Sequence, residues 1–324
     1  MPKKCLIIGL GQIGMGYDLT LDPGTFVYSH AKAFSSHQAF ELSGAVDLSE
    51  SQKFLFERHF KKPGFLSLSE AFQKIKPEVV VIATPTKTHL AVLEKVLGQC
   101  QPEAILCEKP LAYDVEEARK MVEACDKAGA KLFVNYMRRS DSGCVELKKR
   151  IESGEISLPI KGVAWYSKGF LHNGSHLFNL LEFWLGAFKK AKILDEGRFL
   201  DDQDSEPDVQ VEFERGKVVF LACWEEAFSH CTIELLSPSG RLRYEKGGGA
   251  IAWQPTHPDP HISGYKILQA EPEMIDNGMD RYQYHVAHQL ANALADRPYS
   301  LCSGQQALAT LEAMYKIVDP ENEA

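Results

Sequence analysis

The sequence lacks both an apolar run long enough to cross a bilayer and an excess of basic residues. No apolar stretch approaches the roughly 20 residues that a membrane-spanning helix needs. The chain carries 36 Lys and Arg residues against 44 Asp and Glu residues, and its formal net charge is −8. A chain with this balance has no broad positive surface for nucleic acid or for an anionic membrane. We therefore expect neither as a partner.

Cysteine motifs and a secretion signal are also missing. The eight cysteines form no C-x-x-C pair, and several lie in apolar runs, where a thiol behaves as a small hydrophobic side chain. The first four residues, MPKK, lead straight into a strand-like run without a small-residue cleavage site. These features predict a reduced, cytoplasmic protein.

The sequence contains no motif typical of a hydrolase or a catalytic metal. It has no G-x-S-x-G element and no Cys/His signature of a catalytic triad. His257 and His261 are interrupted by prolines, so they do not form a helical pair. His285 and His288 lack a convincing third ligand. We therefore expect no catalytic metal.

The chain is long enough for two domains, since it has 324 residues. Its first 135 residues alternate strand and helix patterns with few hairpin signals, which predicts a doubly wound parallel sheet. The run VVVIA is typical of a strand buried on both faces. Strands are expected at 5–9, 40–46, 77–83, 104–107 and 131–134, and helices at 49–60, 66–75, 88–100 and 115–128.

After residue 135 the pattern becomes typical of antiparallel strands. Arg215-Gly216 and residues 238–240 have the composition of hairpin turns. Residues 136–324 are therefore expected to form an α+β domain with a mostly antiparallel sheet. Its strands are expected within 161–169, 208–227 and 231–249, and its helices at 144–153, 175–185, 284–295 and 304–318.

A glycine motif, Gly9-x-Gly11-x-x-Gly14, follows the first strand. The first glycine permits a tight turn, the second lets the backbone approach a pyrophosphate, and the third lets the following helix pack against the sheet. Its place at the start of a β-α series predicts a Rossmann NAD(P)-binding domain over residues 1–135, although glycines also serve ordinary turns. Gln12 and Ile13 lie between these glycines and are expected at the cofactor. Residues 15–29 interrupt the helix that should follow.

An acidic residue, Asp47, ends the second strand. A Rossmann fingerprint places such a residue about 20 positions after the glycines, where it binds the ribose hydroxyls. Asp47 lies 33 residues after Gly14, and the interruption at 15–29 accounts for the excess. The alternative is an ordinary residue at a helix N-terminus. A carboxylate at this position repels a 2′-phosphate, so NAD(H) is favoured over NADP(H).

Further motifs follow in order along the chain. They are Thr84-Pro85-Thr86 with His89, Glu108-Lys109-Pro110, GSHLFNLLEFWLG at 174–186, and the closing segment at 281–313. As a set they resemble the glucose-fructose oxidoreductase / inositol dehydrogenase / MocA (Gfo/Idh/MocA) family over nearly the whole chain.

The resemblance implies a Rossmann domain followed by a domain with an open, largely antiparallel sheet. Most such proteins use a nicotinamide dinucleotide to oxidise or reduce a hydroxyl-bearing carbon of a sugar, polyol or nucleotide sugar. An open sheet has one face without a helical cover, and 211–226 supplies apolar and aromatic side chains for it. We therefore expect a homodimer or homotetramer packed through the C-terminal sheet.

The resemblance also implies roles for individual residues. Lys109 matches the lysine beside the nicotinamide and the reacting carbon. His176 matches the proton-transfer histidine of a helix motif, D-x-G-x-H-x-x-D, whose glycine is Gly174. The first Asp of that motif falls on His172 and the last on Asn179, so the expected carboxylates are missing. His172 is either a polar partner or the acid/base itself.

Hydride transfer from an alcohol needs a base for the hydroxyl proton and a cation for the developing alkoxide. His176 and Lys109 suit these two roles. The alternative for Lys109 is a surface lysine, and the alternative for His176 is a buried histidine with a purely structural role. For His89 the alternative to a cofactor contact is a helix cap. Other expected cofactor contacts are Thr84, Pro85, His89 and Glu108. Expected substrate contacts are Tyr136, Arg138, Tyr166, Asn173 and Asn179, with solvent-facing arginines as the alternative reading of 138 and 139.

Two other functions fit the same motifs. The altered helix motif is also consistent with a non-catalytic, dinucleotide-bound sensor or scaffold. A third possibility is a non-redox enzyme that uses tightly held NAD for transient oxidation during elimination or hydrolysis. The sequence does not identify the substrate.

Overall fold

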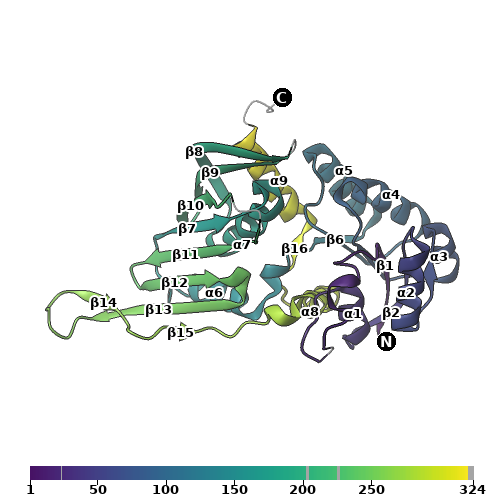
Figure 1. The fold of residues 1–324 in the computed structure, drawn as a ribbon, viewed down its shortest axis with the longest axis horizontal. Helices are drawn as coiled ribbons and strands as arrows, with labels where there is room; N and C mark the ends of the chain where they lie inside the picture. Colours follow the sequence, from purple (N-terminus) through teal and green to yellow (C-terminus); the bar gives the residue numbers. More distant parts are fainter. Residues whose placement is uncertain (23, 202–203, 225–226, 320–324) are drawn as a thin grey trace. The chain divides into compact units, whose positions relative to one another are not determined.

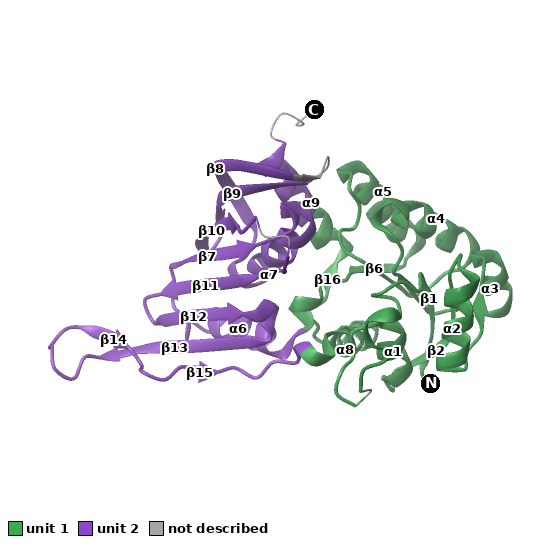
Figure 2. Ribbon diagram, in the orientation of Figure 1, with its two compact units in different colours: residues 1–140, 280–309 green, residues 141–279, 310–324 purple. Residues whose placement is uncertain are grey.

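The computed structural model describes residues 1–22, 24–201, 204–224 and 227–319 (Figure 1). The chain forms two compact units, which are coloured separately in Figure 2. Unit 1 comprises residues 1–140 and 280–309, and unit 2 comprises residues 141–279 and 310–324. A single boundary near residue 135 does not describe this division, because the chain returns to unit 1 at residue 280.

Unit 1 is built on a seven-stranded sheet with the order β16-β6-β5-β4-β1-β2-β3. All neighbouring strands are parallel except β16, which runs antiparallel to β6. All four residues of β4 are buried, as the run of β-branched residues predicts. The strands are β1 (Lys3–Ile8), β2 (Phe40–Val46), β3 (Gly64–Phe65), β4 (Val79–Ile82), β5 (Ala104–Cys107), β6 (Lys131–Val134) and β16 (Cys302–Ser303). The predicted doubly wound parallel sheet is confirmed.

The helices of unit 1 begin at local sequence signals. Ser29, Ser49, Ser67 and Asp114 each accept a hydrogen bond from a backbone amide of the first turn, which satisfies one of the amides that lack a helical partner. Helices α1 and α8 lie side by side (Figure 1). The helices are α1 (His30–Ser36), α2 (Glu50–Phe60), α3 (Leu68–Lys74), α4 (His89–Gln99), α5 (Val115–Ala128) and α8 (Tyr282–Leu294).

A contact between the buried His37, which follows the last residue of α1, and the exposed His288 of α8 predicts a pH-dependent stability. Nε2 of His37 lies 3.4 Å from Nδ1 of His288, and His37 is 4% exposed. Burial, with a smaller effect of His288, lowers the pKa of His37 from 6.5 to about 4. Between those values the unfolded chain takes up a proton that the folded chain refuses, so stability falls as pH drops from 6.5 to 4.

We expect His37 to account for a loss of about 2–3 kcal/mol over this window. His37→Gln should therefore flatten the dependence of the urea unfolding midpoint on pH between 7.5 and 4. His59→Gln is the matched control, because His59 is exposed on α2. An unchanged slope in His37→Gln would show that this histidine titrates alike in both states.

Unit 2 is built on a nine-stranded sheet with the order β14-β13-β12-β11-β7-β10-β9-β8, and β15 pairs with β13. Its neighbouring strands are antiparallel except for β7 and β10. The strands are β7 (Ile160–Tyr166), β8 (Phe188–Asp201), β9 (Asp204–Phe213), β10 (Gly216–Ala222), β11 (Thr232–Ser237), β12 (Gly240–Glu245), β13 (Ala250–Pro258), β14 (Lys266–Leu268) and β15 (Glu273–Met274). The predicted, mostly antiparallel sheet is confirmed.

Helices cover the sheet of unit 2 with large apolar side chains. They are α6 (Ser142–Glu152), α7 (Ser175–Leu185) and the end of α9 (Gly304–Val318). Trp184 and Phe178 of α7 are fully buried against strand residues such as Phe213 and Phe220. None of the helices within the described ranges is both long and apolar enough to cross a membrane.

Candidate active site

The expected cofactor contacts share one edge of the sheet in unit 1. The glycine turn follows β1, Asp47 follows β2, Thr84 follows β4, and Glu108 and Lys109 follow β5. These strands are neighbours and parallel, so their carboxyl ends lie together. Ligands of open α/β sheets bind at this edge, where the strand order reverses. Here the reversal falls between β1 and β4.

The glycine turn has the shape that a dinucleotide needs. Gly9 has a φ of +96°, and a Cβ atom there would lie 2.6 Å from the carbonyl oxygen of Ala83. A Cβ atom on Gly14 would collide with the carbonyl oxygen of Gly9. Nothing lies within 4 Å of the corresponding point on the exposed Gly11. Close backbone packing therefore explains Gly9 and Gly14, and Gly11 leaves room for a phosphate to approach the main chain.

The insertion that follows this turn is looped out of α1. The carbonyl oxygens of Ile13 and Gly14 accept hydrogen bonds from the amides of His30, at 3.0 Å, and Ala31, at 2.9 Å. In an uninterrupted helix these two carbonyls would accept from the amides of residues 17 and 18, four positions further on. The observed donors lie thirteen positions beyond those, so thirteen residues are inserted while the helical bonding is kept. Without them, Asp47 would lie 20 residues after Gly14, which is the spacing of the fingerprint.

A buried carboxylate holds the inserted loop. Asp18 is 2% exposed and accepts hydrogen bonds from the amides of Tyr28, at 2.6 Å, and Ser29, at 2.9 Å. The Ser29 hydroxyl donates a third bond to it at 2.6 Å. The amide of Val27 donates to the carbonyl of Asp280, just before α8. The loop is therefore a braced part of unit 1.

Asp47 is fixed beside the glycine turn. Its Oδ2 accepts from the amide of Leu10 at 2.7 Å, and its Oδ1 accepts from the amide of Ser49 at 2.8 Å. Ser49, not Asp47, is the N-cap of α2. Each carboxylate oxygen can accept a further hydrogen bond, so the half-buried Asp47 suits the ribose hydroxyls of a dinucleotide.

Glu108 lies in a hydrogen-bond network that the sequence does not reveal. Its Oε1 is 2.7 Å from Nε2 of His30 and accepts a bond from Nδ2 of Asn135, also at 2.7 Å. Burial alone would raise the pKa of the Glu108 carboxyl, but His30, Asn135 and Lys109 together lower it. Lys109 is half-buried, and its amide donates to Glu108 Oε2 at 3.4 Å.

His89 is buried and braces two loops. Its Nδ1 lies 3.0 Å from the carbonyl oxygen of Leu111, and its Nε2 lies 2.9 Å from that of Thr84. The side chain is 0% exposed, so it does not reach a ligand. We correct the expected cofactor contact: His89 positions Thr84 and is neither a ligand nor a helix cap.

The two arginines after β6 differ in their surroundings. Both are buried, so the reading as solvent-facing side chains is wrong. Arg139 donates to the carbonyl of Ser300 and to Gln306. Arg138 is 9% exposed, and its Nε and Nη1 have no hydrogen-bond partner among the described residues. A buried guanidinium is stable when an anion or several acceptors pair with it, so Arg138 fits a polar ligand.

In unit 2, a π-helical turn carries the histidine motif. Gly169–Gly174 forms this turn, directly before α7, after Lys168 in a left-handed conformation with a φ of 62°. Asp204 accepts hydrogen bonds from the amides of Leu171 and His172, each at 2.8 Å. His172 is exposed and His176 partly buried. Such π turns and left-handed residues recur at functional sites.

Two expected substrate contacts belong to the core of unit 2. Tyr166 is 0% exposed, and its hydroxyl donates to the carbonyl of Pro207 at 2.6 Å. Asn179 is 1% exposed, and its Nδ2 donates to the hydroxyl of Thr310 at 3.0 Å. Thr310 in turn donates to Glu182. Because buried polar groups of this kind hold the fold together, we assign Tyr166 and Asn179 structural roles.

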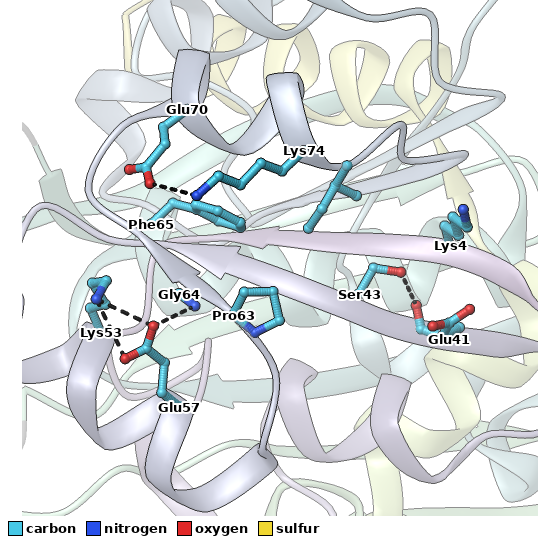
Figure 3. A pocket seen from close by; sticks show the side chains of 11 residues that line it. Lys4, Glu41, Ser43, Lys53, Glu57, Pro63, Gly64, Phe65, Glu70 and Lys74 are labelled. Carbon is cyan, nitrogen blue, oxygen red and sulfur yellow. Dashed lines mark hydrogen bonds and ion pairs between the residues drawn. The ribbon is translucent and has the colours of Figure 1, made fainter.

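A hollow of about 500 Å³ lies elsewhere in unit 1 (Figure 3). Its wall includes Lys4, near the amino end of β1, and so it is distant along that strand from Gly9. Two lysines of its wall pair with glutamates of the same wall, in Lys53–Glu57 and Lys74–Glu70. It contains none of the expected site residues.

The sheet order, the glycine turn and the strand-end carboxylate define unit 1 as a dinucleotide-binding Rossmann domain. Among the described residues, no group of three or more His, Cys, Asp or Glu side chains is placed to hold a metal ion. Residues 3–136 match the GFO_IDH_MocA model, described as an oxidoreductase family with an NAD-binding Rossmann fold. Over residues 3–136 the chain is therefore similar to the Gfo/Idh/MocA oxidoreductase family.

The relatives of this chain include inositol dehydrogenases. The scyllo-inositol 2-dehydrogenase (NAD(+)) of Bacillus subtilis is 30% identical over 173 residues, which cover 52% of this chain and 44% of that protein. The inositol 2-dehydrogenase of Rubrobacter xylanophilus is 39% identical over 98 residues, 30% of this chain and 28% of that protein. The aligned segments thus span less than half of either relative.

Solved structures share the fold over the whole chain. The WlbA dehydrogenase from Bordetella pertussis, in complex with NADH and UDP-GlcNAcA, has a TM-score of 0.74 and 19% identity, covering 99% of this chain and 97% of that one. The aldose-aldose oxidoreductase from Caulobacter crescentus, complexed with glycerol, has a TM-score of 0.77 and 16% identity, covering 99% and 98%.

Proposed function

We propose that this protein is an NAD-dependent oxidoreductase acting on a hydroxyl-bearing carbon of a sugar, polyol or nucleotide sugar. The observation that carries the proposal is Lys109, half-buried at the strand edge that also holds the open Gly11 turn and Asp47. The similarity to inositol dehydrogenases supports this substrate class. Unit 1 is the cofactor-binding unit in this proposal, and His176, the proposed proton-transfer residue, belongs to unit 2.

When bound, the nicotinamide supplies a hydride acceptor or donor. The amides of the glycine turn hold the pyrophosphate, and Asp47 accepts hydrogen bonds from the ribose. The ammonium of Lys109 stabilises negative charge on the substrate oxygen during transfer. His176 takes the hydroxyl proton in the oxidative direction and returns it in reduction. His172 assists or replaces it in this role.

Contacts with substrate come from three further side chains in this proposal. Arg138 offers a buried cationic donor, as argued above. Tyr136, which is 4% exposed, opens the same turn, and Asn173 is partly buried next to the histidine motif. Hydroxyl-rich substrates offer both donors and acceptors to such groups.

The second candidate is a dinucleotide-bound sensor. It is favoured by the replacement of both motif carboxylates, at His172 and Asn179, and by the burial of Asn179 in the core. We distinguish the candidates by absorbance at 340 nm with NAD(H) and a panel of polyols, sugars and nucleotide sugars. Steady turnover supports the dehydrogenase, and binding without turnover supports the sensor. Product without net NADH would instead identify transient oxidation.

Asp47 is proposed to set the preference for NAD(H) over NADP(H). Its fixed carboxylate disfavours a 2′-phosphate, so calorimetry should show tighter NAD(H) binding. Asp47→Asn should reduce the ratio of the two affinities by about tenfold, or ~1.4 kcal/mol. Glu50→Gln is the control, because Glu50 is an exposed carboxylate at the start of α2. Tighter NADP(H) binding by the unmodified protein would refute this assignment.

A homodimer or homotetramer is proposed to form through the sheet of unit 2. Trp165 on β7 and Leu236 on β11 are 42% and 50% exposed and alternate with buried neighbours on their strands. Exposed apolar groups on one sheet face favour self-association. Trp165→Glu should therefore yield monomers in light scattering at micromolar concentration. Phe54→Glu, which changes an exposed aromatic residue on α2, should leave the mass unchanged. A monomeric unmodified protein would contradict the proposal.

We also propose a reducing compartment, the cytoplasm. The eight cysteines form no disulfide, and five of them are buried. Thiols persist in the cytosol, where disulfides are rare.

A further inference from the structure

The inserted loop carries an exposed aromatic side chain, Tyr17, directly behind the glycine turn. Tyr17 is 54% exposed and belongs to a short 3-10 turn, η1 (Gly16–Asp18). Its amide donates to the carbonyl of Gln12, and the amide of Gly16 donates to the carbonyl of Gly11, each at 3.0 Å. The backbone of Tyr17 is therefore bonded to the turn at which a dinucleotide places its pyrophosphate.

The residue after Tyr17 connects the loop to the end of β5. The buried Asp18 accepts a hydrogen bond from the hydroxyl of Ser29 at 2.6 Å, and Ser29 directly precedes His30. Nε2 of His30 lies 2.7 Å from Oε1 of Glu108, which follows β5. A series of bonded and adjacent residues thus leads from Tyr17 to Glu108.

Tyr282, the first residue of α8, interacts with both Tyr17 and Glu108. Its ring stacks on that of Tyr28, with the ring centroids 5.1 Å apart and the ring planes at 18°. Burial has the largest effect in raising the pKa of Tyr282, and the charges of Tyr17 and Glu108 raise that pKa further. Because charges act over a short range in salt solution, Tyr17 and Glu108 share one neighbourhood.

The strand order assigns this neighbourhood to one half of a bound dinucleotide. Asp47 follows β2 on one side of β1, whereas Glu108 follows β5 on the other side, beyond β4. A Rossmann sheet consists of two mononucleotide-binding halves, and the acidic residue after the second strand binds the adenosine ribose. With the pyrophosphate at the glycine turn, the nicotinamide half extends over β4 and β5, which is the side of Tyr17.

We propose that the ring of Tyr17 packs against the nicotinamide ring of bound NAD(H), which makes the inserted loop part of the cofactor site. Pairs of aromatic rings stabilise a complex beyond the area that they bury. The backbone bonds of the loop hold Tyr17 in place before the cofactor binds, so little conformational entropy is lost on binding. The proposal rests on the proposed function, because it concerns the cofactor of the same site.

Calorimetry with two probes, NADH and ADP-ribose, tests this role, because ADP-ribose lacks the nicotinamide ring. Tyr17→Ala should weaken NADH binding by about tenfold and leave ADP-ribose binding within about twofold. Tyr17→Phe keeps the ring and should bind both probes within about twofold of the unmodified protein. Phe54→Ala, which removes an exposed aromatic ring from α2, is the matched control and should change neither affinity.

Equal losses of affinity for both probes in Tyr17→Ala would show that Tyr17 acts on the glycine turn, and they would overturn the proposal. Unchanged NADH affinity in Tyr17→Ala, or a loss in Tyr17→Phe as large as in Tyr17→Ala, would overturn it as well. Because Tyr17 is exposed, the urea unfolding midpoint of each variant should match that of the unmodified protein. Absence of turnover with the substrate panel would refute the proposed function alone, since both probes report on binding without a substrate.

Discussion

Lys109→Ala is expected to lower kcat by about 10²–10³-fold while NAD(H) affinity changes only a few-fold. The reason is that a cation aimed at the substrate oxygen acts mainly on the charge that develops in the transition state. Binding of the dinucleotide depends instead on the glycine turn and on Asp47, which keep their own hydrogen bonds.

The matched control for this variant is Lys87→Ala. Lys87 is an exposed lysine that follows β4 at the same edge of the sheet. It should retain kcat within about twofold, since exposed side chains away from special features contribute little. Calorimetry with NADH and steady-state kinetics separate the two effects. A Lys109→Ala protein with unimpaired kcat would remove the assigned role, whether or not it still binds NADH.

His176→Ala is expected to lower kcat by about 10²–10⁴-fold, the usual effect of removing a general base. His172 decides how the altered motif functions. If His172 only orients a neighbour, His172→Ala costs less, and His172→Asp, which restores the carboxylate of the family motif, retains activity.

If His172 is itself the base, His172→Ala should be as damaging as His176→Ala. The double variant should then be little worse than either single one, because residues that act as a unit are not additive. The kcat of these four variants, the three single ones and the double one, is measured at saturating NAD(H). Full activity in His176→Ala would show that the family motif is a structural relic in this chain.

Local sequence patterns predict most of unit 1 because its strands and helices follow local physical rules. The β-branched run of β4 and the serine caps of α2 and α3 place these elements to within one or two residues. The glycine spacing and Asp47 identify the cradle in the same way. Helix α7 is also predicted to the residue, since its apolar content is high and Gly186 ends it.

Other features depend on contacts between distant residues and leave little local signal. Strand β8 is charged and largely exposed, so it lacks the alternation of a half-buried strand. Strand β13 was not predicted either, and the return of α8 to unit 1 depends on packing against α1. The His30–Glu108 pair joins residues 78 apart. Burial of Tyr166, Asn179 and His89 likewise follows from tertiary packing.

The most direct test of the central claim is isotope transfer from substrate to cofactor. The best substrate of the panel, deuterated at its carbinol carbons, is incubated with NAD⁺ and the protein, and the NADH is analysed by mass spectrometry. Direct hydride transfer predicts one deuterium at C4 of the dihydronicotinamide. NADH without deuterium, or no NADH with any member of the panel despite measurable NAD⁺ binding, would contradict the account.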